Sequence, residues 1–269
     1  KILTGVVEEF QAKKACAVVL DPSTGEVLAM ASTPVFDTNI YPSIEETNRR
    51  NAVVTDQYEP GSTFKMVVAA GALEAGIVTP ETTFTLEPTI QVYDRVVHEA
   101  HEDVPAVREL SVTDILAQSS NVGAVTLGLK LGKDRLVDII QKFGFTKKLG
   151  VDFPGEASGS MLDPEEWSGT TIANVPIGQG ISVSPLQLAA AYAAIANDGV
   201  LVQPHLVREV NSTWSRRVVS DTVAAELRTM LSVTVEDGTG TNAQVAGYEV
   251  AGKTGTAQKV DEVNGGYAD

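Results

Sequence analysis

One serine in the sequence has a lysine three positions further along the chain. The segment Ser62-Thr63-Phe64-Lys65 is the only Ser-x-x-Lys that the chain contains. A serine hydroxyl is a poor nucleophile until a neighbouring base takes its proton, and residues i and i+3 of a helix share a face with Cβ atoms about 5–6 Å apart. Lys65 can therefore act as base for Ser62, provided that burial and nearby positive charge lower its pKa well below about 10.4. The pattern predicts an activated serine nucleophile.

The residues around Ser62 place it at the start of a helix. Pro60 and Gly61 favour a turn, and the Ala- and Val-rich run that continues to about Ala75 has the composition of a buried helix. The first N–H groups of a helix have no partner inside it, and the helix dipole is positive at that end. Negative charge that develops on an attacked carbonyl would be stabilised there, which favours acyl transfer.

Two further short motifs follow in the chain. The second motif, Ser119-Ser120-Asn121, is the only Ser-x-Asn, and the third motif, Lys253-Thr254-Gly255, is the only Lys followed by Ser or Thr and then Gly. A Ser-x-x-Lys alone is expected about once by chance in a chain of this length, and each short motif alone could be an ordinary helix or turn. Together and in this order they match a serine acyltransferase constellation, so we interpret them as one site.

The composition of the 269-residue chain excludes several functions. Its 20 Lys and Arg residues against 35 Asp and Glu residues give a net charge of −15, which repels nucleic-acid phosphates and anionic lipids. We expect no nucleic-acid partner. No run approaches the roughly 18 apolar residues of a membrane-spanning helix, so we expect this stretch to be soluble by itself. The single Cys16 cannot form an internal disulfide, and we interpret it as a small buried apolar residue.

The order of the expected elements predicts one α+β domain. Two apolar runs between Ala17 and Ala31 flank a Pro- and Gly-containing turn, which is typical of a β-hairpin. Residues 252–256 have the pattern of a strand. We expect the N- and C-terminal segments to form a mostly antiparallel sheet packed against helices, with a largely helical middle region. The expected helices are the end of one in 1–13, Ser62 to Ala75, one capped by Ser111, Lys133 to Phe143, Pro185 to Asn197 and Asp221 to Glu236, and a β-like stretch runs from Phe84 to Val97.

Other candidate sites in the sequence are weaker. The histidines of His98-Glu99-Ala100-His101 are three positions apart, and a helical zinc motif needs four, so we expect a solvated loop there. The Gly178-Gln179-Gly180 and Gly238-Thr239-Gly240 pairs lack the rest of a phosphate-binding loop. His205 stands alone and is expected to be structural, and Glu165-Glu166 to be a solvated helix start. We expect no metal and no cofactor.

The chain resembles the transpeptidase domain of penicillin-binding proteins, in the penicillin-recognising serine enzyme superfamily. The segments Tyr58 to Lys65 (YEPGSTFK) and Gly252 to Gln258 (GKTGTAQ) are close to that family's motifs. Thr33 to Asn39 (TPVFDTN) and Gly178 to Gln187 (GQGISVSPLQ) are similar to class B, monofunctional members related to the division and elongation transpeptidases. The resemblance spans nearly the whole chain, and it implies the serine β-lactamase and transpeptidase type of fold for residues 1–269.

The resemblance implies a catalytic role for five residues. Ser62 would attack the D-Ala-D-Ala peptide carbonyl and become the acyl-enzyme, while Lys65 takes its proton. Ser119 would relay a proton toward the leaving amine, and Lys253 would keep this network cationic and lower the pKa of Lys65. Asn121 would orient Lys65 and hydrogen-bond the amide side chain of the substrate.

The same resemblance gives the third motif and its neighbour a role in binding. The hydroxyls of Thr254 and Thr256 would hold the terminal carboxylate of the substrate, and Gly255 would keep the strand uncrowded so that the substrate can lie alongside it. The backbone N–H groups of Ser62 and Thr256 would form the oxyanion hole.

Partners and a place in the cell are also implied by the family. The donor would be a peptidoglycan stem peptide that ends in D-Ala-D-Ala, the acceptor a second stem peptide, and β-lactam antibiotics would acylate the same serine. A membrane glycosyltransferase and division or elongation proteins are the expected partners of a membrane-anchored full-length form at the extracytoplasmic face of the bacterial membrane. Relatives carry an N-terminal anchor, a non-catalytic domain, and strands and a helix after the third motif, so we expect a domain truncated at both ends.

Several functions share this acylation apparatus. A D,D-carboxypeptidase or a serine β-lactamase passes the acyl group to water, but the sequence lacks the Glu-x-x-Leu-Asn segment of class A β-lactamases and has Ser-Ser-Asn in place of Ser-Asp-Asn. A non-catalytic β-lactam sensor or a division-complex scaffold is the other alternative, although all motif side chains are present. We expect a serine D,D-transpeptidase.

Overall fold

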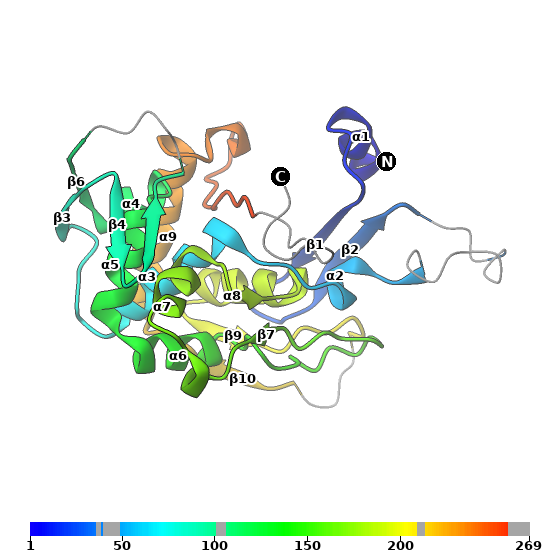
Figure 1. Ribbon diagram of the computed structural model, residues 1–269. Coiled ribbons are helices and arrows are strands. Elements are labelled where there is room, and N and C mark those ends of the chain that lie inside the picture. Colours follow the sequence, from blue (N-terminus) through cyan, green and yellow to red (C-terminus); the bar gives the residue numbers. More distant parts are fainter. Residues whose placement is uncertain (36–38, 40–48, 101–105, 209–212, 258–269) are drawn as a thin grey trace.

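Figure 1 shows the computed structural model, which describes residues 1–35, 39, 49–100, 106–208 and 213–257. Residues 36–38 of the segment from Thr33 to Asn39, together with His101 and Gln258, lie outside these ranges. The described residues form helices and short antiparallel strand pairs, so the predicted α+β class is confirmed. In the figure the helical part with α3, α4 and α5 lies to the left, and the β1–β2 hairpin extends to the right.

The helices agree closely with those expected from the sequence. Those predicted from residues 133, 185 and 221 onward begin at these residues and end within one residue of the expected position. Ser111 caps its helix with a reciprocal capping box, in which it accepts from the N–H of Asp114 and the Asp114 carboxylate accepts in return. The described helices are α1 (Ile2–Glu9), α2 (Ala52–Thr55), α3 (Lys65–Glu74), α4 (Val112–Ala117), α5 (Asn121–Leu131), α6 (Lys133–Lys142), α7 (Thr171–Asn174), α8 (Pro185–Ala196) and α9 (Asp221–Glu236), with 3-10 turns η3 (Gly61–Phe64), η4 (Pro164–Glu166), η5 (Val175–Ile177) and η6 (Thr241–Ala243).

Every strand pair within the described ranges is antiparallel. The predicted hairpin is present: Ala15 pairs with Thr33 and Val18 with Met30 across its two strands. Cys16 is half-buried on the first of these strands rather than fully buried. The pairs are β1 (Ala15–Leu20) with β2 (Val27–Thr33), β3 (Thr83–Leu86) with β6 (Arg108–Ser111), β4 (Thr89–Val92) with β5 (Arg95–His98), β7 (Ser160–Met161) with β8 (Ile181–Ser182), and β9 (Val200–Val202) with β10 (Ser215–Arg217).

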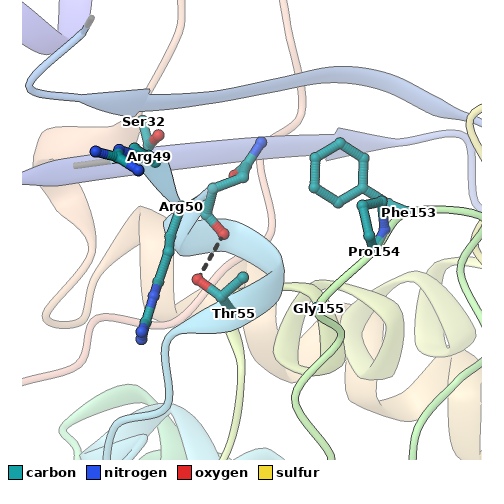
Figure 2. A pocket seen from close by; sticks show the side chains of 8 residues that line it. Ser32, Arg49, Arg50, Thr55, Phe153, Pro154 and Gly155 are labelled. Carbon is teal, nitrogen blue, oxygen red and sulfur yellow. Dashed lines mark hydrogen bonds between the residues drawn. The ribbon is translucent and has the colours of Figure 1, made fainter. Parts of the chain in front are cut away.

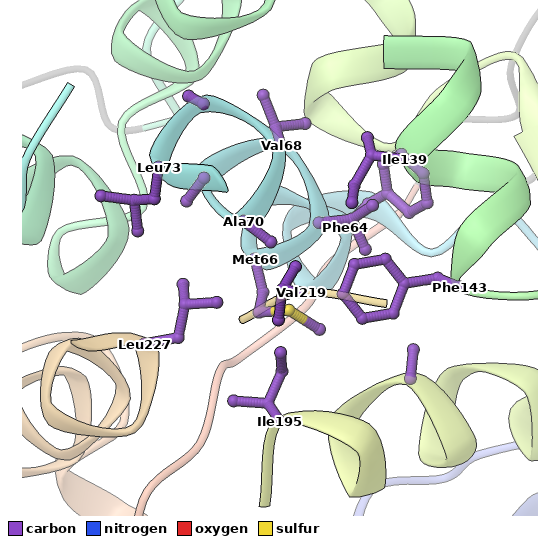
Figure 3. Close-up of a cluster of buried hydrophobic side chains, with 14 of the residues drawn as sticks. Phe64, Met66, Val68, Ala70, Leu73, Ile139, Phe143, Ile195, Val219 and Leu227 are labelled. Carbon is purple, nitrogen blue, oxygen red and sulfur yellow. The ribbon is translucent and has the colours of Figure 1, made fainter. Parts of the chain in front are cut away.

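Helix α3 lies in the middle of the hydrophobic core. Its residues from Lys65 to Leu73 are all buried, because α5, α6 and α9 pack around it. Figure 3 shows Phe64 and Met66 among side chains that include Ile139 of α6 and Leu227 of α9. The ring of Phe64 packs edge-on against that of Phe145, with centroids 5.4 Å apart. Each fully buried side chain of this size stabilises the fold by about 1.5–3 kcal/mol. The start of α3, where the first motif lies, is therefore fixed by the core itself.

The strand predicted over residues 252–256 is wrong. An extended segment becomes a strand only through ladder hydrogen bonds to a neighbour, and the β1–β2 sheet has two strands in the described part of the chain. The Gly252 N–H instead donates to the Leu231 carbonyl on α9, 3.2 Å away. The third motif thus packs against α9 and the start of α3, not on the N-terminal hairpin.

Candidate active site

Ser62 lies in a 3-10 turn just ahead of α3. The predicted helix from Ser62 to Ala75 is present, but its first turn is the tighter η3, and α-helical geometry begins at Lys65. Ser62 is partly exposed, whereas Gly61 and Phe64 on either side are buried. The first N–H groups of such a turn have no partner inside it. The sequence therefore presents a serine hydroxyl at the surface beside the backbone N–H groups of a helix start.

Two close backbone contacts fix the turn that carries Ser62. The Gly61 N–H donates to the Gly178 carbonyl, 3.2 Å away. A Cβ atom on Gly178 would lie 2.1 Å from the Gly61 carbonyl oxygen, and one on Gly61 would lie 2.3 Å from the Thr256 carbonyl oxygen. Both glycines have positive φ, which L residues rarely adopt. The Gly178-Gln179-Gly180 segment is therefore a support for the first motif.

Lys65 is buried directly behind this turn, with 2% of its surface exposed. Its Nζ donates to the Ser119 carbonyl oxygen (2.5 Å), to Asn121 Oδ1 (2.7 Å) and to Ser119 Oγ (3.3 Å). Within the described ranges the Ser62 hydroxyl is not among its hydrogen-bond partners. The structure thus joins the first and second motifs through the lysine.

The surroundings of Lys65 favour its neutral form. Burial, assisted by the positive charge of Lys253, lowers its pKa to about 7, while the negative charge of Glu99 acts in the opposite direction. Burial also lowers the pKa of Lys253 to about 8. A substantial fraction of Lys65 is therefore unprotonated near neutral pH, as a general base requires.

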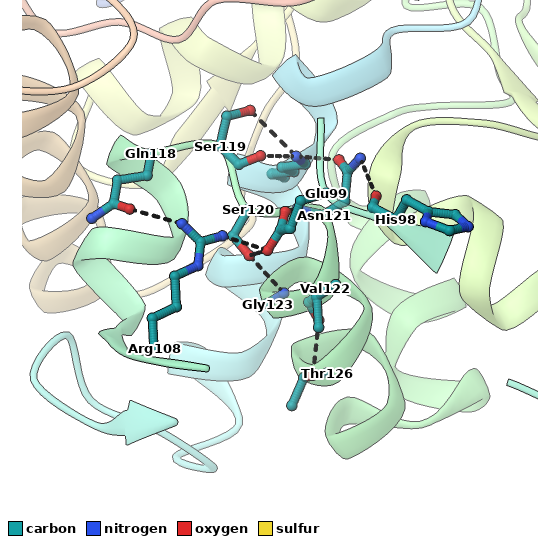
Figure 4. Close-up of polar contacts among 11 residues, drawn as sticks. His98, Glu99, Arg108, Gln118, Ser119, Ser120, Asn121, Val122, Gly123 and Thr126 are labelled. Atoms are coloured by element: carbon teal, nitrogen blue, oxygen red, sulfur yellow. Dashed lines mark hydrogen bonds and ion pairs between the residues drawn. The ribbon is translucent and has the colours of Figure 1, made fainter. Parts of the chain in front are cut away.

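The second motif forms the junction between α4 and α5 (Figure 4). Ser119 has φ of 59°, a left-handed conformation that is uncommon for a residue other than glycine. Ser120 caps α5 by accepting from the Gly123 N–H at 2.9 Å. The Asn121 side chain donates from Nδ2 to the His98 carbonyl at 3.0 Å, so its oxygen is turned toward Lys65. Strained backbone of this kind persists where the surroundings over-determine it.

The third motif lies beside the first at the molecular surface. Lys253 Nζ donates to the Thr254 carbonyl (3.1 Å) and lies 3.3 Å from Thr254 Oγ1. The Thr254 hydroxyl also lies 2.7 Å from that of Thr239. A Cβ atom on Gly255 would lie 2.6 Å from Thr63 Cγ2, so the glycine is needed for packing against the first motif. Thr254 and Thr256 are exposed, as residues that meet a substrate must be.

Three residues of this region were not identified from the sequence: Glu99, Arg108 and Thr239. The prediction of a solvated loop is wrong for Glu99, whose side chain is 4% exposed and pairs with Arg108. Thr239, set aside with the glycines around it, donates its N–H to the Ala117 carbonyl and reaches the third motif. No spacing rule links these residues to the motifs: Glu99 contacts Asn121 across 22 residues of chain, and Thr239 contacts Thr254 across 15.

The other candidates occupy ordinary structural positions. His205 is buried, and its ring nitrogens lie 3.0 and 3.2 Å from the Val207 and Thr24 carbonyl oxygens. Glu165 and Glu166 are exposed in η4. In the described ranges no cluster of three or more His, Cys, Asp or Glu residues is suited to a metal ion. The described helices include none with the length and apolar character needed to cross a membrane.

A cavity of about 600 Å³ lies away from the three motifs, between β2, α2 and the segment after α6. Figure 2 shows Phe153 and Pro154 on one wall and Thr55 on another, where the Thr55 hydroxyl donates to the Asn51 carbonyl at 3.1 Å. None of its lining residues belongs to a motif, so we do not place the reaction there. The lining residues are Ser32, Arg49, Arg50, Asn51, Thr55, Phe153, Pro154 and Gly155.

An α+β fold with a helix-start serine and a buried lysine one turn further on is that of a serine acyltransferase. The chain belongs to the penicillin-binding protein transpeptidase domain family, whose model matches residues 15–269. The resemblance seen in the sequence is therefore confirmed.

Individual relatives agree with this assignment. Penicillin-binding protein PbpB of Mycobacterium tuberculosis is 40% identical over 276 residues, which cover 94% of this chain and 40% of that protein. The probable peptidoglycan D,D-transpeptidase PenA of Neisseria meningitidis is 37% identical over 268 residues, 99% of this chain and 45% of that protein. The chain thus spans less than half the length of these two relatives. The crystal structure of penicillin-binding protein 3 from M. tuberculosis complexed with aztreonam superposes with a TM-score of 0.91 at 37% identity, covering 99% of this chain and 63% of that one.

Proposed function

We propose that this chain is the catalytic domain of a serine D,D-transpeptidase that cross-links peptidoglycan stem peptides through an acyl-enzyme on Ser62. The observation that carries the proposal is the position of Lys65. It is buried one helical turn after Ser62, it donates to Ser119 and Asn121, and its pKa is lowered to about 7. A lysine in such a position serves as a base at neutral pH.

In the acylation step the Oγ atom of Ser62 attacks the carbonyl carbon between the two D-Ala residues of the donor. The hydroxyl proton passes to Lys65, and the C–N bond to the terminal D-Ala breaks. The leaving amine receives a proton through Ser119, whose Oγ lies 3.3 Å from Lys65 Nζ. In the second step the amine of the acceptor peptide attacks the ester carbon, and Ser62 regains its proton as the new amide forms.

The exposed residues beside Ser62 suit the remaining needs of this reaction. The N–H groups of Ser62 and Thr256 would bind the oxyanion, since Thr256 packs against Gly61 in the preceding turn. The hydroxyls of Thr254 and Thr256 would bind the terminal carboxylate, with Lys253 nearby as a cation. One N–H of the Asn121 amide is taken by the His98 carbonyl, which leaves the other to meet the substrate.

We also propose β-lactams as ligands, because a solved relative holds aztreonam and all residues of the acylation apparatus are present here. In this proposal the domain works at the extracytoplasmic face of the bacterial membrane, where peptidoglycan is cross-linked. Its partners there would be a membrane glycosyltransferase and division or elongation proteins. The relatives that carry the family's names are longer than this chain, so these partners belong to the proposal for the whole protein.

The test is to incubate the chain with a donor peptide ending in D-Ala-D-Ala and a D-amino acid acceptor, and to measure products by mass spectrometry. We expect release of D-Ala together with the acceptor-linked product, and neither product from Ser62→Ala. Hydrolysis alone at saturating acceptor would indicate a carboxypeptidase. Absence of both products together with covalent penicillin labelling would indicate a sensor.

A further inference from the structure

The Glu99 carboxylate occupies a buried position behind the second motif. Its Oε1 accepts from Ser120 Oγ and from Arg108 Nη2, each at 2.5 Å, and its Oε2 accepts from the Asn121 N–H at 2.7 Å. The side chains of Glu99 and Arg108 are 4% and 18% exposed. A charge this deeply buried is retained only where partners satisfy both of its oxygens. Figure 4 shows this cluster beneath the junction of α4 and α5.

The cluster connects the two helix ends that flank Ser119. Arg108 donates from Nη1 to Oε1 of Gln118, the C-cap residue of α4, at 3.1 Å. Glu99 binds Ser120 and Asn121 at the start of α5. The left-handed Ser119 lies between these two anchored ends. The ion pair thus fixes the junction whose carbonyl oxygen and amide accept from Lys65.

We propose that Glu99, paired with Arg108, is a positioning residue that sets the Ser119–Asn121 junction so that both residues reach Lys65. This inference rests on the proposed acylation at Ser62. It assigns to the reaction a carboxylate that lies outside the three motifs and that binds Arg108, Ser120 and the Asn121 backbone.

The charge of Glu99 has a second consequence for the same lysine. In the described part of the chain the charged groups facing Lys65 are Lys253, from the third motif, and Glu99, which follows β5, while Arg108 on β6 is paired with Glu99. Lys253 lowers the pKa of Lys65 and Glu99 raises it. Loss of the carboxylate charge therefore lowers that pKa further, so more of the lysine is neutral at a given acidic pH.

The experiment measures the acylation rate by a fluorescent penicillin between about pH 5 and 9. Glu99→Gln keeps the size of the side chain but puts an amide NH₂ against N–H donors. We expect its maximal rate to fall about tenfold or more, and the acidic limb of its profile to move to lower pH. Glu99→Asp keeps the charge, so its rate should fall while the limb stays in place. If Glu99 had a purely structural role, the acidic limb would stay in place in both variants.

Glu156→Gln is the matched control, because the Glu156 carboxylate also accepts backbone N–H groups, from Leu149 and Gly150, but lies away from Lys65. It should leave rate and profile unchanged. If Glu99→Gln does not fold, Ser120→Ala serves instead, because it removes one hydrogen bond of the Glu99 carboxylate and keeps its charge. The acylation rate of Ser120→Ala should fall, while the acidic limb of its pH profile stays in place. Equal rates and profiles for wild type and these variants would overturn the inference alone. A wild-type chain that is not labelled would overturn the proposed function and this inference with it.

Discussion

The Oδ1 atom of Asn121 lies 2.7 Å from the Nζ atom of Lys65, so the second motif accepts a hydrogen bond from the lysine of the first. The substitution Asn121→Ala removes this acceptor, so one N–H of the buried Lys65 loses its hydrogen-bond partner. A hydrogen bond to a charged group contributes about 1.5–3 kcal/mol, so the acylation rate should fall about 10- to 150-fold.

The measurement is the second-order rate constant for a fluorescent penicillin. Asn197→Ala is the control, since Asn197 donates from its amide to the Val200 carbonyl after α8, away from the site. Both variants should lose similar stability, but only Asn121→Ala should lose rate. Equal rates for the two would contradict the role given to Asn121.

The pH dependence of acylation should follow the two lysines. The rate should rise as Lys65 loses its proton near pH 7 and fall above about pH 8 as Lys253 loses its own. In Lys253→Met the neighbouring cation is gone, the pKa of Lys65 rises, and the acidic limb should move to higher pH. Lys142→Met, which removes an exposed lysine paired with Asp138 on α6, should leave the profile in place. An acidic limb that Lys253→Met does not shift would show that these charges are not coupled.

The buried charge of Lys65 should lower the free energy of unfolding at acidic and neutral pH. Its pKa is about 7 in the folded chain and about 10.4 unfolded. Between these values the unfolded state binds more protons, so stability of the wild type rises with pH there. Replacing the lysine by methionine removes the cost, and Lys65→Met should be more stable than wild type by about 2–4 kcal/mol at pH 6.5, with a smaller difference at pH 9.

Urea unfolding of both proteins at the two pH values checks this. A difference that grows with pH would have the wrong sign, and it would mean that Lys65 is charged and well paired in the folded state. The variant should also be inactive, so a gain in stability accompanies the loss of the base.

Gly178 should be needed for its lack of a side chain rather than for its conformation alone. Gly178 and Gly180 both have positive φ, but a Cβ atom on Gly178 would lie 2.1 Å from the Gly61 carbonyl oxygen, whereas one on Gly180 would meet nothing within 4 Å. Gly178→Ala should displace the turn before Ser62 and slow acylation about 10- to 100-fold. Gly180→Ala should lose about 1–3 kcal/mol of stability through strain but keep its rate. Equal rates in the two variants would contradict the support role of this contact.

Local signals in the sequence were sufficient for the helices and for the hairpin. Caps such as Ser111 with Asp114, and the Pro- and Gly-rich turn between β1 and β2, act over a few residues, so the elements that they bound could be predicted. The motifs were also recognisable, because their chemistry requires fixed residue types at short spacing. The order of residues 60–65 was enough to place Ser62 beside a helix start.

Contacts between distant segments could not be predicted in the same way. Residues 252–256 have the composition of a strand, but pairing depends on a neighbour elsewhere in the chain, and the described structure gives them α9 instead. Glu99 reaches Asn121 across 22 residues of chain. Its neighbours in sequence suggested a solvated loop, since burial of a single carboxylate leaves no periodic pattern. The left-handed φ of Ser119 has no sequence signal either, because serine rarely adopts it.

The most direct test of the account is the intact mass of the chain after incubation with benzylpenicillin, followed by peptide mapping. Attack by a serine hydroxyl opens the β-lactam ring without loss of atoms, so the mass should rise by that of the whole antibiotic. The adduct should map to Ser62, within the segment from Tyr58 to Lys65, and be absent from Ser62→Ala. An adduct on another residue, or an unmodified wild-type chain, would contradict Ser62 as the nucleophile.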